Sequence, residues 1–141
     1  MAWNKPRPDI DQDMFPFWEG LKEHQLLLMR CKVCGAYYWP AAYCRFHENE
    51  PFFGSMEWVP TSGRGKVFSF GVTYQVFHPG FAGEVPFVYA LIELDEGPMF
   101  GTRILDVEAG DVAVGMPVRI GFLDVPEEGF TLPMAYPVKA G

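Results

Sequence analysis

Cysteine is scarce in this sequence, which has three cysteines and three histidines among 141 residues. Three thiols cannot all pair within one chain, and the polar, proline-broken stretch MAWNKPRPDIDQDM at the N-terminus lacks the apolar core of a secretory signal. Both features favour a reducing cytoplasm over a disulfide framework. Long apolar runs are absent too, since none approaches the ~20 residues of a membrane span. We therefore expect a soluble, cytoplasmic protein with no membrane partner.

Basic residues are also few. The chain has 11 lysines and arginines against 18 acidic residues, a net charge of −7 and a pI of about 4.8. A protein that neutralises a phosphate backbone needs a basic face, so we expect no nucleic-acid partner. Between residues 84 and 128 the only basic side chains are Arg103 and Arg119. A phosphorylated ligand is therefore expected nearer the cysteine segment, where basic residues are denser.

Catalytic motifs are missing as well, since the sequence holds no complete nucleotide-binding fingerprint and no identifiable nucleophile–base pair. The stretch Ser62–Lys66, SGRGK, leads into a predicted strand and is interpreted as a bulged strand entry, with Arg64 and Lys66 as candidate contacts to a ligand phosphate. Phe77 and His78 begin the longest glycine- and proline-rich loop. A lone loop histidine is more often solvated than catalytic, so these two residues are candidate ligand contacts only.

Aromatic residues, by contrast, are abundant: they make up 16% of the chain, and the length allows a real buried core. Near the N-terminus, Phe15, Trp18 and Leu21 recur at helical spacing after a possible cap at Asp11 or Asp13, which predicts a short amphipathic helix. The following run QLLLMRC is interpreted as a buried strand leading into the first cysteine, with a helix as the alternative.

The pattern changes after residue 56 to short strands. The stretches VPFVYALIELDEG and PMFGTRILDV predict a hairpin through the D-E-G turn, and MPVRIGFLDV and FTLPMAYPV supply two more strands. The only helical candidate in this region, Val107–Gly115, is too short for more than a turn or two. Five or six strands with almost no helix between them favour a small closed barrel of the OB type.

The cysteine segment has the spacing of a zinc knuckle. Cys31 and Cys34 form a C-x-x-C pair, and Cys44 and His47 repeat the spacing after nine residues. Gly35 permits the backbone reversal that such a knuckle needs. Four nitrogen and sulfur ligands with no open position predict a closed, structural Zn²⁺ site.

Other interpretations of the segment stay open. The thiols are either zinc ligands or unrelated buried residues, and His47 is either the fourth ligand or no ligand. A redox C-x-x-C usually begins a helix in a βαβ unit, and the sequence provides no such unit. A catalytic zinc needs an open coordination position, which a four-ligand knuckle does not offer. We therefore predict a structural or docking module.

Several stretches, in order, resemble those of a known family: FWEGLKEHQLLLMRCKVCG, SGRGKVFSFGVTY, PFVYALIELDEG and VGMPVRIGF. The chain is identified as a member of a family of zinc-ribbon/OB-fold proteins that was long known only as a domain of unknown function and is associated with acyl-CoA metabolism. The resemblance runs from about Phe17 to Phe122. It implies a mainly β fold: an arm, helix and first ribbon strand over residues 1–29, a rubredoxin-like zinc ribbon over 30–55, and an OB-fold barrel over 56–141.

The resemblance also implies a function. Family members are typically small subunits of thiolase-like proteins, in which the large subunit carries the catalytic cysteine. We therefore expect a non-catalytic subunit, in a heterotetramer or larger complex, that helps to enclose the CoA or acyl group of a thioester during cleavage or formation of a carbon–carbon bond. The family ribbon usually has four cysteines, and here His47 takes the fourth place.

Aromatic residues at Phe15–Trp18, Tyr37–Trp39 and Phe52–Phe53 fit either an apolar interface with such a subunit or the core between barrel and ribbon. The alternative hypothesis is a stand-alone acyl-CoA-binding module. It predicts a soluble monomer with measurable affinity for CoA, whereas the subunit hypothesis predicts a chain that needs its partner.

Overall fold

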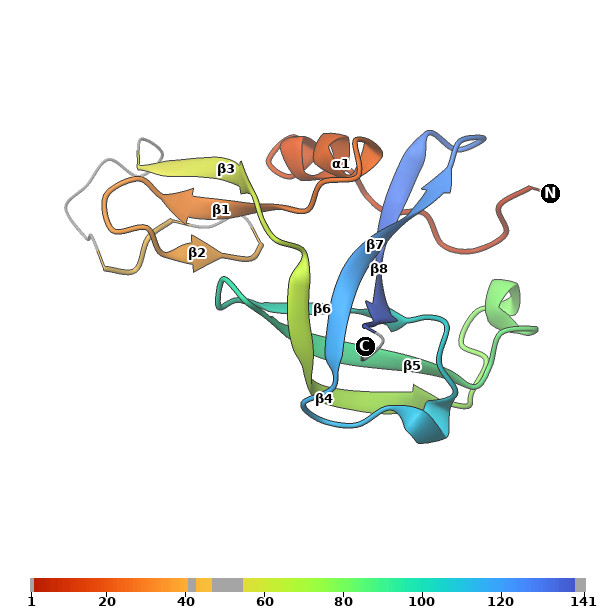
Figure 1. Cartoon of the computed structure of the whole chain (residues 1–141). Coiled ribbons are helices and arrows are strands. Elements are labelled where there is room, and N and C mark those ends of the chain that lie inside the picture. The colour runs from red at the N-terminus through yellow and green to blue at the C-terminus, as the bar shows by residue number, and fades with distance from the viewer. Residues whose placement is uncertain (1, 41–42, 47–54, 139–141) are drawn as a thin grey trace.

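The computed structural model of the chain describes residues 2–40, 43–46 and 55–138 (Figure 1). One helix and two sheets make up this part. The elements are α1 (Phe15–Lys22), β1 (Leu27–Cys31), β2 (Tyr37–Tyr38), β3 (Met56–Pro60), β4 (Arg64–Thr73), η1 (Pro79–Phe81), β5 (Phe87–Leu94), β6 (Met99–Ile104), η2 (Ala109–Asp111), β7 (Pro117–Val125) and β8 (Phe130–Pro137). The fold is mainly β with one N-terminal helix, as predicted.

Helix α1 begins after Asp11, whose carboxylate accepts a hydrogen bond from the backbone N–H of Met14 at 2.8 Å. Pro16 lies in the first turn, where its missing N–H costs no helical hydrogen bond. The predicted apolar face was partly wrong: Phe15 is 52% exposed, whereas Phe17 and Leu21 are buried. The buried face is set by packing, because Phe17 contacts aromatic rings of the ribbon and barrel that the local pattern does not contain.

The first sheet has the order β2-β1-β3 and carries the cysteine segment. Its central strand β1 confirms the strand interpretation of QLLLMRC. Strand β3 pairs antiparallel with β1 from Leu27↔Pro60 to Cys31↔Met56. The change from the first sheet to the barrel therefore falls between Pro60 and Arg64, rather than at residue 56, where the sequence pattern changes.

The second sheet is a closed five-stranded barrel in the order β4-β5-β6-β8-β7. Strands β5 and β6 form the predicted hairpin, and Gly97 in its turn has φ +114°, a conformation that L side chains rarely adopt. Strand β4 has a register shift between Val67 and Ser69, slightly beyond the SGRGK stretch for which a bulge was predicted. A parallel contact, Ile104↔Ala135, joins β6 to β8. The helical candidate Val107–Gly115 contains only the turn η2.

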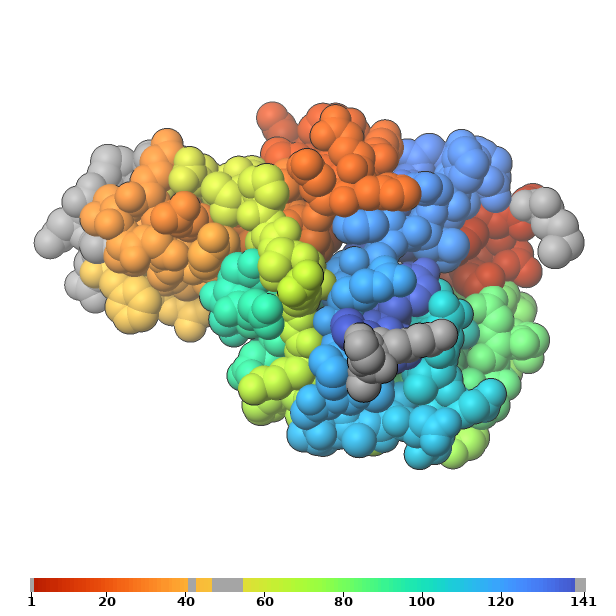
Figure 2. Space-filling model, viewed as in Figure 1, coloured from red at the N-terminus to blue at the C-terminus, as the bar shows by residue number. Residues whose placement is uncertain are grey.

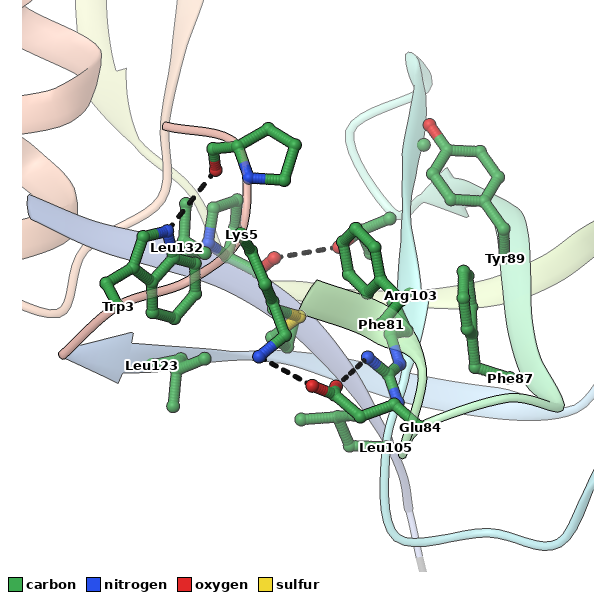
Figure 3. A pocket seen from close by; sticks show the side chains of 15 residues that line it. Trp3, Lys5, Phe81, Glu84, Phe87, Tyr89, Arg103, Leu105, Leu123 and Leu132 are labelled. Atoms are coloured by element: carbon green, nitrogen blue, oxygen red, sulfur yellow. Dashed lines mark hydrogen bonds and ion pairs between the residues drawn. The ribbon is translucent and has the colours of Figure 1, made fainter. Parts of the chain in front are cut away.

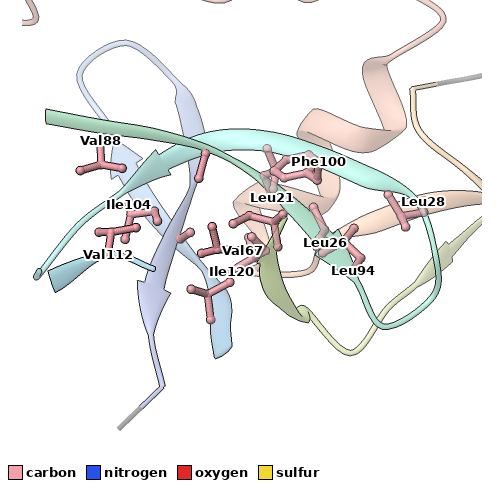
Figure 4. Close-up of a cluster of buried hydrophobic side chains, with 14 of the residues drawn as sticks. Leu21, Leu26, Leu28, Val67, Val88, Leu94, Phe100, Ile104, Val112 and Ile120 are labelled. Atoms are coloured by element: carbon pink, nitrogen blue, oxygen red, sulfur yellow. The ribbon is translucent and has the colours of Figure 1, made fainter. Parts of the chain in front are cut away.

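The main core runs without interruption from the barrel to the helix (Figure 4). Val67, Ile92 and Val118 fill the barrel, while Leu21 and Leu28 extend the same cluster toward the ribbon. In the space-filling view, the ribbon projects as a lobe beside α1 and the barrel (Figure 2). A smaller buried cluster inside this lobe contains Cys31, Tyr38 and Cys44.

We expect Phe17→Ala to lower the free energy of unfolding by about 3–5 kcal/mol, because it leaves a cavity among rings from three parts of the fold. Phe15→Ala, two residues earlier on the exposed side, is the matched control and should change the free energy by no more than about 0.5 kcal/mol. Urea unfolding followed by circular dichroism measures both. Equal effects of the two substitutions would contradict the conclusion that Phe17, and not Phe15, packs in the core.

Candidate metal centre and ligand surfaces

The first knuckle begins where β1 ends. Cys31 is the last residue of β1, and its carbonyl accepts a hydrogen bond from the N–H of Gly35 at 2.8 Å. The N–H of Cys31 in turn donates to the carbonyl of Ala36 at 2.8 Å. Gly35 takes φ +78°, so the glycine permits the reversal that brings Cys34 back beside Cys31.

The three thiols converge on one point. The sulfur atoms of Cys31, Cys34 and Cys44 all lie within 4.8 Å of one another, and the Sγ atoms of Cys34 and Cys44 are 3.6 Å apart. Zn–S bonds of about 2.3 Å in tetrahedral geometry place two sulfurs about 3.8 Å apart. Cys31 and Cys44 are buried and Cys34 is exposed. The spacing therefore fits three ligands of a structural zinc ion, which would supply folding energy when bound.

The thiols also affect one another's ionisation. Burial disfavours the thiolate of Cys44, but hydrogen bonds from the Tyr38 hydroxyl and the Phe46 backbone hold its pKa below the usual value. At Cys34 the Ala36 backbone favours the thiolate, yet partial loss of hydration and hydrogen bonds with the two neighbouring thiols raise the pKa. Three thiolates this close repel one another unless a cation lies between them, and a bound metal removes this conflict.

His47 lies outside the described residues, so its part in the site stays a prediction. The candidate ligand contacts fall into two groups. Arg64 and Lys66 are exposed at the start of β4, while Phe77 and His78 follow its far end. The strand that separates them has ten residues, so the four side chains do not form one compact site.

The described histidines have structural partners. His78 Nδ1 accepts a hydrogen bond from the N–H of Gly80 at 3.0 Å and caps the turn η1. His24 lies flat against Phe122, and its Nε2 is 2.9 Å from Asp124 Oδ2. The hydroxyl of Thr131 donates to the same carboxylate. The Asp124 carboxylate therefore lies between the Thr131 hydroxyl and the His24 imidazole. In the described part of the chain, neither imidazole is hydrogen-bonded to a serine, threonine or cysteine.

A groove that the sequence did not reveal lies on the outer side of the barrel (Figure 3). Its walls come from the N-terminal arm, the segment around η1, and strands β5, β6, β7 and β8. Glu84 lines the groove, and its carboxylate is bound by Lys5 and by Arg103 Nη1 at 2.6 Å. Because these residues are far apart in sequence, no local motif predicts them.

One strand edge carries no charge. Strand β4 pairs with β7 only through Arg64–Lys66, and beyond Val67 this edge has no partner strand within the ranges that the structure describes. We call residues 68–77, FSFGVTYQVF, the β4 edge segment. It contains no charged residue, and Tyr74 and Phe77 are 73% and 78% exposed. Exposed edges are usually protected by charges or proline, so this segment is exceptional.

In the described ranges, no helix is long and apolar enough to cross a membrane.

Comparison with known proteins assigns both halves of the fold. The chain matches the family described as "ChsH2, rubredoxin-like zinc ribbon domain" over residues 18–46 and "ChsH2, C-terminal OB-fold domain" over residues 58–123. It is 35% identical to a "DUF35 domain-containing scaffold protein" of Methanocaldococcus jannaschii, covering 79% of this chain and 78% of that protein. The chain belongs to the DUF35 family.

Other relatives carry more specific names. The chain is 34% identical to a "Probable enoyl-CoA hydratase alpha subunit" of Thermomonospora curvata over 94% of its own length and 40% of that protein. It spans about two fifths of the length of the curated hydratase relatives that it matches. Among solved structures, it resembles a chain of the "Ltp2-ChsH2(DUF35) aldolase" with a TM-score of 0.78 and 32% identity, covering 93% of this chain and 98% of that chain.

We expect Cys31→Ser to abolish zinc retention and to unfold the ribbon, because structural zinc sites contribute directly to folding. His47→Ala should weaken zinc retention more mildly. Zinc per chain is measured by atomic absorption after dialysis against a chelator, and unfolding by circular dichroism.

The matched control is Val33→Ser, since Val33 is exposed within the same turn and its side chain is no ligand. Full zinc stoichiometry in His47→Ala would remove His47 from the site. Unchanged zinc in Cys31→Ser would refute the three-cysteine centre.

Glu84 should give the fold an acid-sensitive contact. Burial disfavours its charge, but hydrogen bonds and attraction from Lys5 and Arg103 outweigh this effect and lower its pKa. A lowered carboxyl pKa stabilises the fold above the ordinary value of about 4.3, and this contribution is lost as the pH falls through the folded-state pKa. The stability difference between wild type and Glu84→Gln should therefore shrink from about pH 6 to below pH 4. A difference that stays constant across urea titrations at these pH values would disprove the ionic contribution.

Proposed function

We propose that this DUF35 chain is a non-catalytic small subunit of a thiolase-like enzyme that acts on acyl-CoA thioesters. The observation that carries the proposal is its similarity to the DUF35 chain of the Ltp2-ChsH2 aldolase, which extends over nearly the whole of both chains. Relatives named as hydratase alpha subunits and as a scaffold protein support a role beside another chain.

The residues of the chain support a non-catalytic role. The described histidines bind an aspartate and a turn backbone, and the three cysteines gather in a knuckle. These groups make local contacts, and among the described residues neither histidine is hydrogen-bonded to a cysteine, serine or threonine that it could activate. The partner would then supply the nucleophile that forms or breaks the carbon–carbon bond.

The β4 edge segment is the surface that fits a partner chain best. Beyond Val67 its outer edge pairs with no strand of the described ranges, and Phe68, Tyr74 and Phe77 expose aromatic rings that commonly anchor protein interfaces. A partner that covered it would bury apolar surface without leaving a charge unpaired, since the segment carries none.

CoA enters the proposal as the ligand of the complex. Arg64 and Lys66 are candidates for contacts to its phosphates, since they stand together on an exposed strand end of an acidic protein. Phe77 and His78, at the other end of β4, are candidates for contacts near the partner and the acyl group. The spread of these residues favours an extended ligand that runs across the subunit.

The test is affinity purification of the tagged chain from its native host, with the captured proteins identified and assayed for acyl-CoA cleavage. We expect a thiolase-like chain whose activity requires this subunit. The double variant Tyr74→Lys, Phe77→Lys should lose the partner while keeping its melting temperature, because it places charges on an exposed surface.

Val114→Lys is the matched control, since Val114 is 68% exposed and lies outside the β4 edge segment. Equal capture by the double variant and the control would refute the β4 edge segment as the interface. A monomeric chain that captures no thiolase-like protein and binds CoA by calorimetry would replace the proposal with the stand-alone acyl-CoA-binding module.

A further inference from the structure

The groove on the outer side of the barrel has the size and lining of a small-molecule site. Its volume is about 530 Å³, within the range of about 300–1,000 Å³ that is typical of ligand pockets. In Figure 3, Trp3, Leu123 and Leu132 lie on one side, and Phe81, Phe87 and Tyr89 on the other. The ion cluster of Lys5, Glu84 and Arg103 lies between these walls.

The N-terminal arm is a fixed wall of this groove. The Trp3 ring packs edge-on against Phe130 with centroids 5.5 Å apart, and Arg7 Nη2 binds the Glu128 carboxylate. At Gly80, a Cβ atom would clash with the Asn4 carbonyl oxygen, so the glycine lets the arm approach the segment around η1. Contacts at both walls therefore hold the groove open with the arm in place.

The ion cluster contains more positive than negative charge. Lys5 and Arg103, each with a side chain 19% exposed, share the single carboxylate of Glu84. The Arg103 guanidinium carbon lies 4.6 Å from the centroid of the Phe87 ring, and its buried Nε has no hydrogen-bond acceptor among the described residues. A buried N–H without an acceptor is costly, and a surplus cation between apolar walls attracts an anion strongly.

We propose that this groove binds an amphipathic carboxylate: an apolar chain or ring system that ends in one negatively charged group. The apolar part would lie between the aromatic and aliphatic walls. The carboxylate would neutralise the surplus charge of the cluster beside Lys5 and Arg103. This site is separate from the β4 edge segment, and it does not depend on a thiolase-like partner.

Decanoate, used below its micelle concentration, is the probe for the full chain. The chain is labelled with 5-fluorotryptophan, and the Trp3 resonance is assigned with Trp3→Phe. Decanoate should shift the ¹⁹F resonance of Trp3 saturably and leave that of Trp39, in the ribbon, in place. Arg103→Met should weaken binding about tenfold, the effect expected for one lost charge-assisted hydrogen bond.

Arg119→Met is the matched control, because Arg119 also lies over an aromatic ring, at 4.9 Å from Tyr136, but away from the groove. It should bind decanoate within a factor of about two of wild type. The uncharged 1-decanol should bind about tenfold more weakly than decanoate. Leu132→Trp, which fills the groove, should abolish the shift and decides the question if Arg103→Met does not fold.

Absence of a saturable Trp3 shift in wild type would overturn the proposal. Equal weakening by Arg103→Met and Arg119→Met, or an unchanged shift in Leu132→Trp, would overturn the position of the site. Equally tight binding of 1-decanol would overturn the assignment of the ligand as a carboxylate.

Discussion

The packing of Phe17 joins the three parts of this protein. Its ring comes from α1 and contacts rings of the other two parts. The centroid of the Phe17 ring lies 4.4 Å from that of Trp39, next to the ribbon strand β2, and 6.3 Å from that of Phe100 in the barrel strand β6. The rings of Trp39 and Phe100 also contact each other, with centroids 4.9 Å apart. The helix therefore does not merely cover one sheet. It completes a cluster to which each part contributes a ring, so loss of order in the ribbon removes support from the barrel core.

This junction explains which features the sequence predicts well and which it does not. Neighbouring residues determine three features that the structure confirms: the C-x-x-C turn with Gly35, the strand that leads into Cys31, and the hairpin of β5 and β6. The buried face of α1 is not local, because Phe17 is selected by rings from distant segments. The place of β3 beside β1 is likewise a pairing between distant segments.

The candidate sites show the same division. The thiols of Cys31 and Cys34 meet because the C-x-x-C pair and Gly35 encode a tight turn, and the sulfur of Cys44 joins them within 4.8 Å. His78 was singled out for its residue type, but its imidazole is used locally as a turn cap. The groove escaped prediction since Lys5, Glu84 and Arg103 belong to separate segments that only the closed barrel brings together. The orphaned N–H of Arg103 has no signature in the sequence.

The two unusual surfaces of the barrel differ in the kind of molecule that would satisfy them. The β4 edge segment exposes backbone groups and aromatic rings without a charge, and a long uncharged edge promotes association with another chain. The groove, in contrast, is a concave and mostly apolar surface in which two cations share one carboxylate. A protein surface satisfies the first, whereas a small anion satisfies the second. The described histidines and cysteines make local contacts, so the groups that remain for a partner or a ligand lie in these two surfaces, beside the three-cysteine cluster of the ribbon.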